Sequence, residues 1–173
     1  MFRRDSRGDA PGPNTYQMKQ QMLAIGDDFW IENGAGQRVF KVDGKVLRIR
    51  KTLNLEDAAG SLRYQIKEKL VTVRDVMTIE TEAGPVATVK KALISPLRER
   101  YNVEFAGGGE WKVQGNIVDH QYEIEGPAGK IAEIGKKWFR VRDTYGVQIA
   151  PGQDDALVLA VTIVVDTMSH PTR

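Results

Sequence analysis

Apolar and polar residues alternate with a period of two along most of the chain, which is typical of antiparallel strands that bury one face. Leucine or isoleucine occupies positions 47, 49, 53 and 55, whereas positions 48, 50, 52 and 54 are polar. The same alternation occurs in residues 63–67 and 138–142; in the second segment Phe139 and Val141 would face the core, and Trp138 would face outward with Arg140. These segments predict half-buried strands.

Five Ala-Gly dipeptides divide this pattern into repeats. Their glycines stand 22 to 24 residues apart, at Gly36, Gly60, Gly84, Gly107 and Gly129. Further breaks fall within the intervals, at Asp43-Gly44, Lys67 to Lys69, Ser95-Pro96 and Gly115-Asn116. One repeat is therefore a strand, a turn and a strand. Five repeats and an additional pair within residues 18–25 and 29–32 give about twelve strands.

A glutamate recurs at the strand ends before these turns. In four repeats it stands four positions before the glycine and follows an aliphatic residue, at Glu32, Glu56, Glu80 and Glu125. Repeated turn chemistry is sufficient to explain it, and we assign no ligand to these carboxylates.

The C-terminal segment departs from the period of two. Residues 156–165 are apolar except for Thr162, and Asp154 and Asp155 precede them. Because an acidic pair is an N-cap and first-turn signal, we expect a helix over about 154–167, with a buried strand as the alternative. Such a helix would be about 15 to 21 Å long, too short to cross a hydrocarbon core of about 30 Å. We therefore expect no transmembrane span and a helix surrounded by protein. The helix residues that we expect to pack in the core are Leu157, Leu159, Val161, Ile163 and Val164.

The strand number and the helix are geometrically compatible. Twelve strands about 4.8 Å apart and tilted by about 40° close into a cylinder with a radius of about 12 Å. That radius is close to the packing distance of about 10 Å between a sheet and an element against it, whereas eight strands would leave no room for a helix. The expected fold is mainly β, a closed antiparallel barrel of about 12 strands around a buried hydrophobic C-terminal α-helix.

Length, charge and composition restrict the class of protein. The chain has 173 residues, no cysteine and a net charge of +2. We expect a flexible arm at 1–15 that is no signal peptide, a single domain at 16–168 and a tail at 169–173. The absence of cysteine excludes disulfides and thiolate chemistry and fits a reducing compartment. The balanced charge makes nucleic acid an unlikely partner.

The order of the motifs resembles a known family. It runs from Asp43-Gly44-Lys45 and Leu47-Arg48-Ile49 through Leu55 to Gly60, Val86 to Lys91, Gly115-Asn116, Tyr122-Glu123-Ile124 and Asp143-Thr144-Tyr145 to the apolar segment. From about Met18 to Met168 this order is similar to the LURP-one-related family of the tubby C-terminal-like superfamily. The resemblance implies a twelve-stranded barrel around a central helix. It also implies a link to phosphoinositide-binding tubby-like proteins and to phospholipid scramblases.

Paired cations on outward strand faces are the candidate binding residues. Two arginines two positions apart on a strand lie about 6.6 Å apart on one side, so both can contact one phosphate. Tubby-like proteins use a lysine and then an arginine at this spacing. The two nearest matches in this sequence, Arg48-Ile49-Arg50 and Arg140-Val141-Arg142, both have arginine in place of the lysine. The candidate residues for an anionic head group are Arg48, Arg50, Arg140, Arg142, Lys67 and Lys69. The alternative is an ordinary solvated barrel exterior.

Catalytic and metal-binding patterns are weak. His120 follows Asp119, but no Gly-x-Ser-x-Gly motif is present, and the two histidines lack metal-ligand spacing, so a surface-loop position is expected for His120. Gly107-Gly108-Gly109 precedes a strand and is expected to be a hairpin tip. We expect no enzyme activity, no cofactor and no metal.

These observations leave three hypotheses for function. The first is a cytoplasmic, non-enzymatic binding module that recognises phosphoinositide or an anionic membrane surface, with a peripheral position at the membrane. The second is a protein-interaction scaffold without a lipid ligand. The third is scramblase-like phospholipid transport, which requires the C-terminal segment to leave the barrel.

Overall fold

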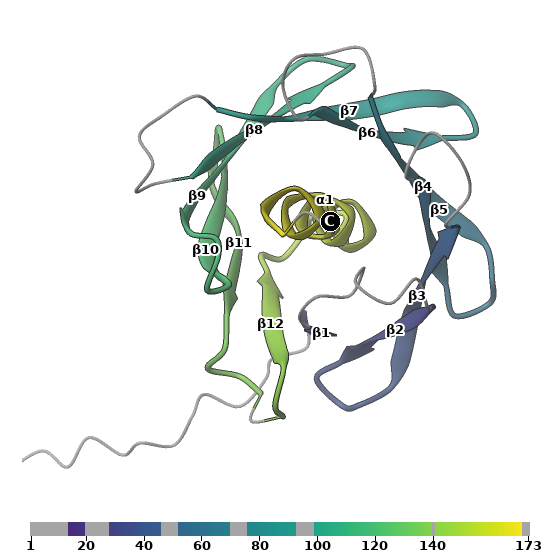
Figure 1. Ribbon diagram of the computed structural model, residues 1–173, viewed down its shortest axis with the longest axis vertical. Helices are drawn as coiled ribbons and strands as arrows, with labels where there is room; N and C mark the ends of the chain where they lie inside the picture. Colours follow the sequence, from purple (N-terminus) through teal and green to yellow (C-terminus); the bar gives the residue numbers. More distant parts are fainter. Residues whose placement is uncertain are drawn as a thin grey trace, which may run out of the picture.

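The computed structural model describes residues 14–19, 28–45, 52–69, 76–92, 99–139 and 141–170. In this part of the chain twelve antiparallel strands form a closed ring around one central helix (Figure 1). The elements in chain order are β1 (Thr15–Lys19), β2 (Phe29–Asn33), β3 (Arg38–Lys45), β4 (Thr52–Asp57), β5 (Leu62–Glu68), β6 (Val76–Thr81), β7 (Gly84–Lys91), β8 (Arg100–Phe105), β9 (Glu110–Asn116), β10 (Gln121–Gly126), β11 (Gly129–Gly135), β12 (Thr144–Ile149) and α1 (Asp155–Ser169). Sequence neighbours pair with each other, and β1 pairs with β12 to close the ring. The predicted fold class is confirmed.

All five Ala-Gly dipeptides lie at hairpin turns on one end of the barrel. They connect β2 to β3, β4 to β5, β6 to β7, β8 to β9 and β10 to β11. Gly36 and Gly60 have φ values of 77° and 85°, a left-handed conformation that glycine adopts without the steric penalty of a side chain. We call this end the hairpin end. We call the opposite end, where β1, β3, β5, β7, β9 and β11 finish, the loop end.

The recurring aliphatic-glutamate pair marks a β-bulge. The strand register shifts between Ile31 and Glu32, and the equivalent shifts fall at Leu55/Glu56, Ile79/Glu80 and Ile124/Glu125. In the fifth hairpin, β8–β9, Val103 stands four positions before the turn glycine, and its pairing with Trp111 continues without a shift. A bulge bends its strand and increases the local twist, which helps a sheet to close. The motif therefore has a more specific structural meaning than turn chemistry alone.

The helix fills the barrel. Asp154 caps it, because a carboxylate oxygen accepts a hydrogen bond from the backbone N–H of Leu157. Residues 158–168 are all buried, as expected for a helix that strands surround. Two hydroxyl groups in this apolar setting donate to carbonyls one turn earlier, Thr162 to Val158 and Thr167 to Ile163. Among the positions expected in the core, Leu159, Val161, Ile163 and Val164 are buried and Leu157 is partly buried.

Two local predictions are wrong. The expected break at Asp43-Gly44 lies inside β3, where both residues pair with β4. The expected strand at 138–142 is absent from the described part of that segment, since β11 ends at Gly135 and β12 begins at Thr144. Trp138, expected to face outward, is buried, whereas Val141, expected to face inward, is 60% exposed.

Glycine at position 146 explains the burial of Trp138 on the outer face of β12, away from the core that Tyr145 and Val147 face. A Cβ atom added there would lie 2.7 Å from Cε3 of Trp138, well inside van der Waals contact. The indole ring therefore occupies space that only glycine leaves open on β12. The segment turns to bring this ring onto the barrel, which removes the alternation from the remaining residues.

Candidate functional site

The two ends of the barrel carry different charges. Acidic residues dominate the hairpin end, where the described acids are Glu32, Glu56, Asp57, Glu82, Glu110, Glu125, Asp154 and Asp155. Glu80 and Glu104 pair with Lys67 and Lys90 across the wall, so these two ion pairs belong to neither end. The cations of the hairpin end are Arg38, Arg63, Lys112 and Lys130. The described cations of the loop end are Lys19, Lys45, Lys69, Lys91, Arg100, Lys136, Lys137 and Arg142. The acids near that end, apart from buried Asp166, are Asp28, Asp43, Glu68, Glu99, Asp119, Glu133 and Asp143, so this end is not acidic, in contrast to the hairpin end.

The sequence between the strands that end and begin at the loop end is rich in arginine. The stretches between the strand ends that lie outside the described residues contain Arg48, Arg50, Lys51, Arg74, Arg98 and Arg140, against Asp27 and Asp75. The overall charge of +2 therefore combines an acidic hairpin end with a loop end whose connecting sequence is basic. The charge arises from topology, because every second connection of an antiparallel barrel lies at the same end.

Two apolar side chains are exposed beside these cations. Val118, in the β9–β10 turn, is 55% exposed, and Val141, in the β11–β12 connection, is 60% exposed. Both turns belong to the loop end. Single exposed apolar side chains are ordinary, and Leu62 at the hairpin end is also 37% exposed, but the two largest exposures are at the loop end.

The predicted head-group residues fall into two sets. Arg48, Arg50 and Arg140 lie outside the described residues. Of the others, Lys69 and Arg142 lie at the loop end, whereas Nζ of Lys67 lies 2.9 Å from Glu80 on the neighbouring strand β6. The Arg142 side chain is 95% exposed and lies 3.7 Å from Asp143, so solvent weakens their interaction.

Ion pairs between neighbouring strands hold several other cations. Lys90 lies 2.9 Å from Glu104 and Lys130 lies 2.6 Å from Glu123. Lys41 pairs with Asp28 at 3.0 Å, and this hydrogen bond lowers the pKa of the Asp28 carboxyl. Such pairs contribute little to stability when exposed, but they leave these lysines less available to an anionic ligand.

A polar groove of about 950 Å³ opens on the outer face of β9, β10 and β11 toward the loop end. Arg100, Lys136 and Lys137 line it together with Glu99 and Glu133. Lys137 pairs with Glu133 at 2.9 Å, whereas Lys136 and Arg100 make no ion pair with another described residue. Its size is suitable for a small ligand, and its charge is mixed.

Two tyrosines attach the start of α1 to the barrel wall at the hairpin end. Tyr64 on β5 donates to Asp154 at 2.5 Å, and Tyr16 on β1 donates to Asp155. Burial raises the pKa of both phenols, and the hydrogen bonds to the carboxylates raise it further. The acidic pair that was expected to cap the helix does so, and it also anchors the helix to two strands.

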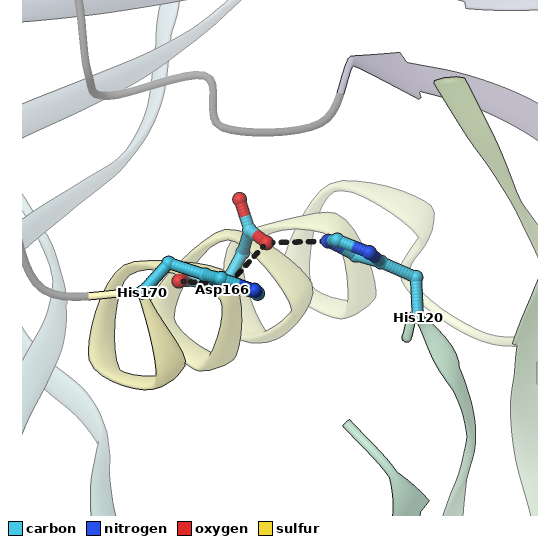
Figure 2. A group of neighbouring side chains, drawn as sticks. All are labelled: His120, Asp166 and His170. Atoms are coloured by element: carbon cyan, nitrogen blue, oxygen red, sulfur yellow. Dashed lines mark hydrogen bonds and ion pairs between the residues drawn. The ribbon is translucent and has the colours of Figure 1, made fainter. Parts of the chain in front are cut away.

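A second cluster lies at the other end of α1. His120, Asp166 and His170 gather where the helix leaves the barrel, His120 coming from the β9–β10 turn (Figure 2). Nε2 of His120 lies 2.7 Å from Oδ1 of Asp166, and Nδ1 of His170 lies 3.3 Å from the same oxygen. His120 and Asp166 are each 4% exposed, and the His170 side chain is 25% exposed. The cluster is therefore an almost buried group of two imidazoles and one carboxylate with one edge open to solvent.

The backbone and the aromatic neighbours hold this cluster in place. His120 has a φ of 53°, a left-handed conformation that costs a side-chain-bearing residue about 1–2 kcal/mol. Its ring stacks on Tyr145 with ring centroids 4.3 Å apart. Burial raises the pKa of Tyr145 well above its usual value, and the Asp166 carboxylate adds to the effect. The Tyr145 hydroxyl is buried without a hydrogen-bond partner among the described residues.

The expected surface position of His120 is thus wrong. His120 is buried because its ring contacts Asp166, which is 46 positions away in the chain. The residues next to His120 in the sequence do not indicate this contact. One signal was present: Asp166 ends a run of apolar residues, and His170 follows it by four positions, one helical turn.

The barrel and its enclosed helix place the protein in the tubby-like fold class. A crystal structure of a protein from Arabidopsis thaliana has the same fold, with a TM-score of 0.67 and 14% identity over 93% of this chain and 95% of that one. The model of the LURP-one-related family matches residues 14–166, and the chain belongs to this family. The uncharacterized protein YxjI of Bacillus subtilis (strain 168) is 26% identical over 153 residues, which are 88% of this chain and 92% of that protein.

Among the described residues, no helix is both long enough and apolar enough to span a bilayer. Family and fold together support a binding module as the general function. The ligand is the subject of the proposal that follows.

Proposed function

We propose that the protein is a non-enzymatic binding module that docks its loop end on an anionic phospholipid surface. The observation that supports this proposal is the separation of charge between the two ends of the barrel. A flat anionic surface attracts each lysine or arginine close to it by about 1 kcal/mol. The barrel would therefore approach with its loop end toward the lipid and its acidic hairpin end away from it.

The exposed valines support the same orientation. Val118 and Val141 lie at the loop end with 55% and 60% of their surface exposed. At a membrane interface such side chains would enter the layer between head groups and acyl chains, and they would add an apolar contribution to the electrostatic one. The groove beside Arg100 and Lys136 offers a place for an anionic head group.

Vesicle co-sedimentation with two matched variants tests the proposal. The loop-end variant is Lys69→Glu/Arg142→Glu, and the control at the hairpin end is Arg63→Glu/Lys112→Glu. All four residues are exposed, and both variants change the net charge equally. Vesicles of phosphatidylcholine with phosphatidylserine should bind the wild type and the control, and the loop-end variant at least about tenfold more weakly.

The other outcomes separate the remaining hypotheses. Equal losses in both variants would contradict a defined docking end, and no binding at low salt would contradict the proposal as a whole. Stoichiometric capture of a protein partner that neither variant affects would favour a scaffold. Scramblase-like transport requires α1 to leave the barrel, and its eleven consecutive buried residues, 158–168, make that a global rearrangement.

A further inference from the structure

We propose that His120, Asp166 and His170 bind a divalent transition-metal ion of the Zn²⁺ class, which links the β9–β10 turn to the C-terminal end of α1. This site lies at the loop end and shares the β9–β10 turn with Val118, but none of its three ligand residues belongs to the proposed lipid contact. The potential ligand atoms of the three residues all lie within 4.8 Å of one another. The cluster supplies two imidazoles and a carboxylate, a donor set that occurs in zinc sites with an open fourth position.

Of the three ligand separations, the two that involve Asp166 are within about 1 Å of what a zinc ion requires, and the two imidazole nitrogens lie within 4.8 Å of each other. Bonds of about 2.0 to 2.2 Å place two tetrahedral ligands about 3.4 Å apart. The 3.3 Å between Nδ1 of His170 and Oδ1 of Asp166 already matches that separation. Nε2 of His120, at 2.7 Å from the same oxygen, would have to move outward by about 0.7 Å. Figure 2 shows that the imidazoles of His120 and His170 both lie next to the carboxylate of Asp166.

The burial of Asp166 calls for a positive partner. The residue is 4% exposed on a helix that is otherwise nearly apolar, and an isolated carboxylate is unstable in such a setting. Its ion-pair partners among the described residues are His120 and His170. A metal ion would supply the positive charge directly, in place of the imidazole proton that otherwise lies between nitrogen and oxygen.

The backbone already holds the three side chains in positions from which they can bind one ion. Asp166 and His170 stand four positions apart, so one helical turn brings both to the same face. His120 reaches the site only because the turn adopts a left-handed conformation, with a φ of 53°. Strained backbone of this kind is frequent where a side chain must be aimed at a ligand. The partly exposed His170 leaves a path for the ion.

Nitrogen donors determine the class of ion. Imidazole favours zinc, copper, nickel and iron, whereas magnesium and calcium prefer oxygen ligands. The chain has no cysteine, so no thiolate competes for a soft ion. Zn²⁺ should therefore bind, and Mg²⁺ and Ca²⁺ at the same concentration should not.

Nuclear magnetic resonance of the imidazole rings provides a direct test on the full chain. The protein contains two histidines, so both observable ring systems belong to the proposed site. One equivalent of ZnCl₂ added to protein previously treated with a chelator should shift both sets of signals, and removal of the ion with EDTA should reverse the shifts. Movement of one ring alone, or of neither, would overturn the proposal.

Equilibrium dialysis with variants provides the second test. Asp166→Asn, His170→Gln and His120→Asn each remove one ligand, and asparagine tolerates the left-handed backbone at position 120. Each should weaken Zn²⁺ binding at least about tenfold. Asp119→Asn is the matched control, because Asp119 is an exposed acid next to His120. Retained binding in a folded His170→Gln variant, or an equal loss in the control, would refute the site, and the ring signals of the wild type decide the matter if a variant does not fold.

Discussion

The hydroxyl of Tyr64 donates a hydrogen bond to Asp154, the residue that caps the first turn of α1, although the two residues are 90 positions apart. Tyr16 makes the equivalent contact with Asp155 from β1. The helix is therefore held at its start by strands from two parts of the barrel, in addition to its apolar contacts. This double attachment leads to the first two predictions.

Tyr64→Phe should lower the free energy of unfolding by about 1–2 kcal/mol, because it removes a hydrogen bond from a buried tyrosine to a charged group. Asp154→Asn retains the helix cap but removes the charge, so its effect should overlap with that of Tyr64→Phe. A double-mutant cycle by urea unfolding measures the coupling. Additive effects of the two substitutions would mean that the contact does not stabilise the barrel.

Alkaline pH should destabilise the protein. Burial and the neighbouring carboxylates raise the pKa of Tyr16 and Tyr64 in the folded state, whereas the unfolded value is about 10. The stability that these phenols contribute is fully present below about pH 10 and is lost as the pH rises from there toward the folded-state pKa. Urea unfolding at pH 8 and pH 11 should give a lower free energy at the higher pH.

A variant separates the tyrosines from the lysines, which also begin to lose their charge in this range. Tyr16→Phe/Tyr64→Phe should be less stable than the wild type at pH 8 but should lose less stability between pH 8 and pH 11. If the double variant and the wild type lose the same amount, the two phenols do not control the alkaline transition.

Leu159→Asp should prevent stable folding, with a loss of more than about 4 kcal/mol, since it places an unpaired charge inside the barrel. Val161→Asp should have the same effect, and both residues are 0% exposed. Leu62→Asp is the control, because Leu62 is 37% exposed on β5, and it should cost about 1 kcal/mol or less. A melting temperature within a few degrees of the wild type for Leu159→Asp would contradict the enclosure of the helix.

Gly146→Ala should destabilise the protein by about 1–3 kcal/mol, because the new methyl group would lie 2.7 Å from the Trp138 ring. Gly135→Ala is a matched test beside the same ring, where the added Cβ would lie at an ordinary contact distance of 3.6 Å. Thermal unfolding of both variants should show a clear loss for the first and little change for the second. Equal melting temperatures would mean that Trp138 can move aside without cost.

The sequence predicts the fold well because its strongest signals are local. The Ala-Gly turns, the acidic cap and the apolar run at 156–165 each specify an element without reference to distant residues, and strand number then determines the barrel radius. The wrong strand at 138–142 has a definite cause. Alternation cannot distinguish a strand from a connection whose tryptophan packs on a glycine of the next strand, here Gly146.

The candidate sites depend on longer-range information. The separation of charge appears only when the strands are assigned to their directions, since lysines such as Lys69 and Lys136 are 67 positions apart in the chain and share an end only through topology. The cluster at His120 requires a turn to meet the last turn of the helix. Neither arrangement follows from residue types and spacing alone.

The position of α1 after the closing strand has a consequence for synthesis on the ribosome. The first strand has no partner on one side until β12 emerges, more than a hundred residues later, and the core stays empty until the helix follows. During that interval the helix does not yet cover the apolar inner faces of the first eleven strands, and exposed apolar surfaces associate readily with other chains. Closing and filling then occur almost together, so a nascent chain that stalls before residue 155 would be a strong substrate for chaperones and proteases, whereas the completed barrel would not.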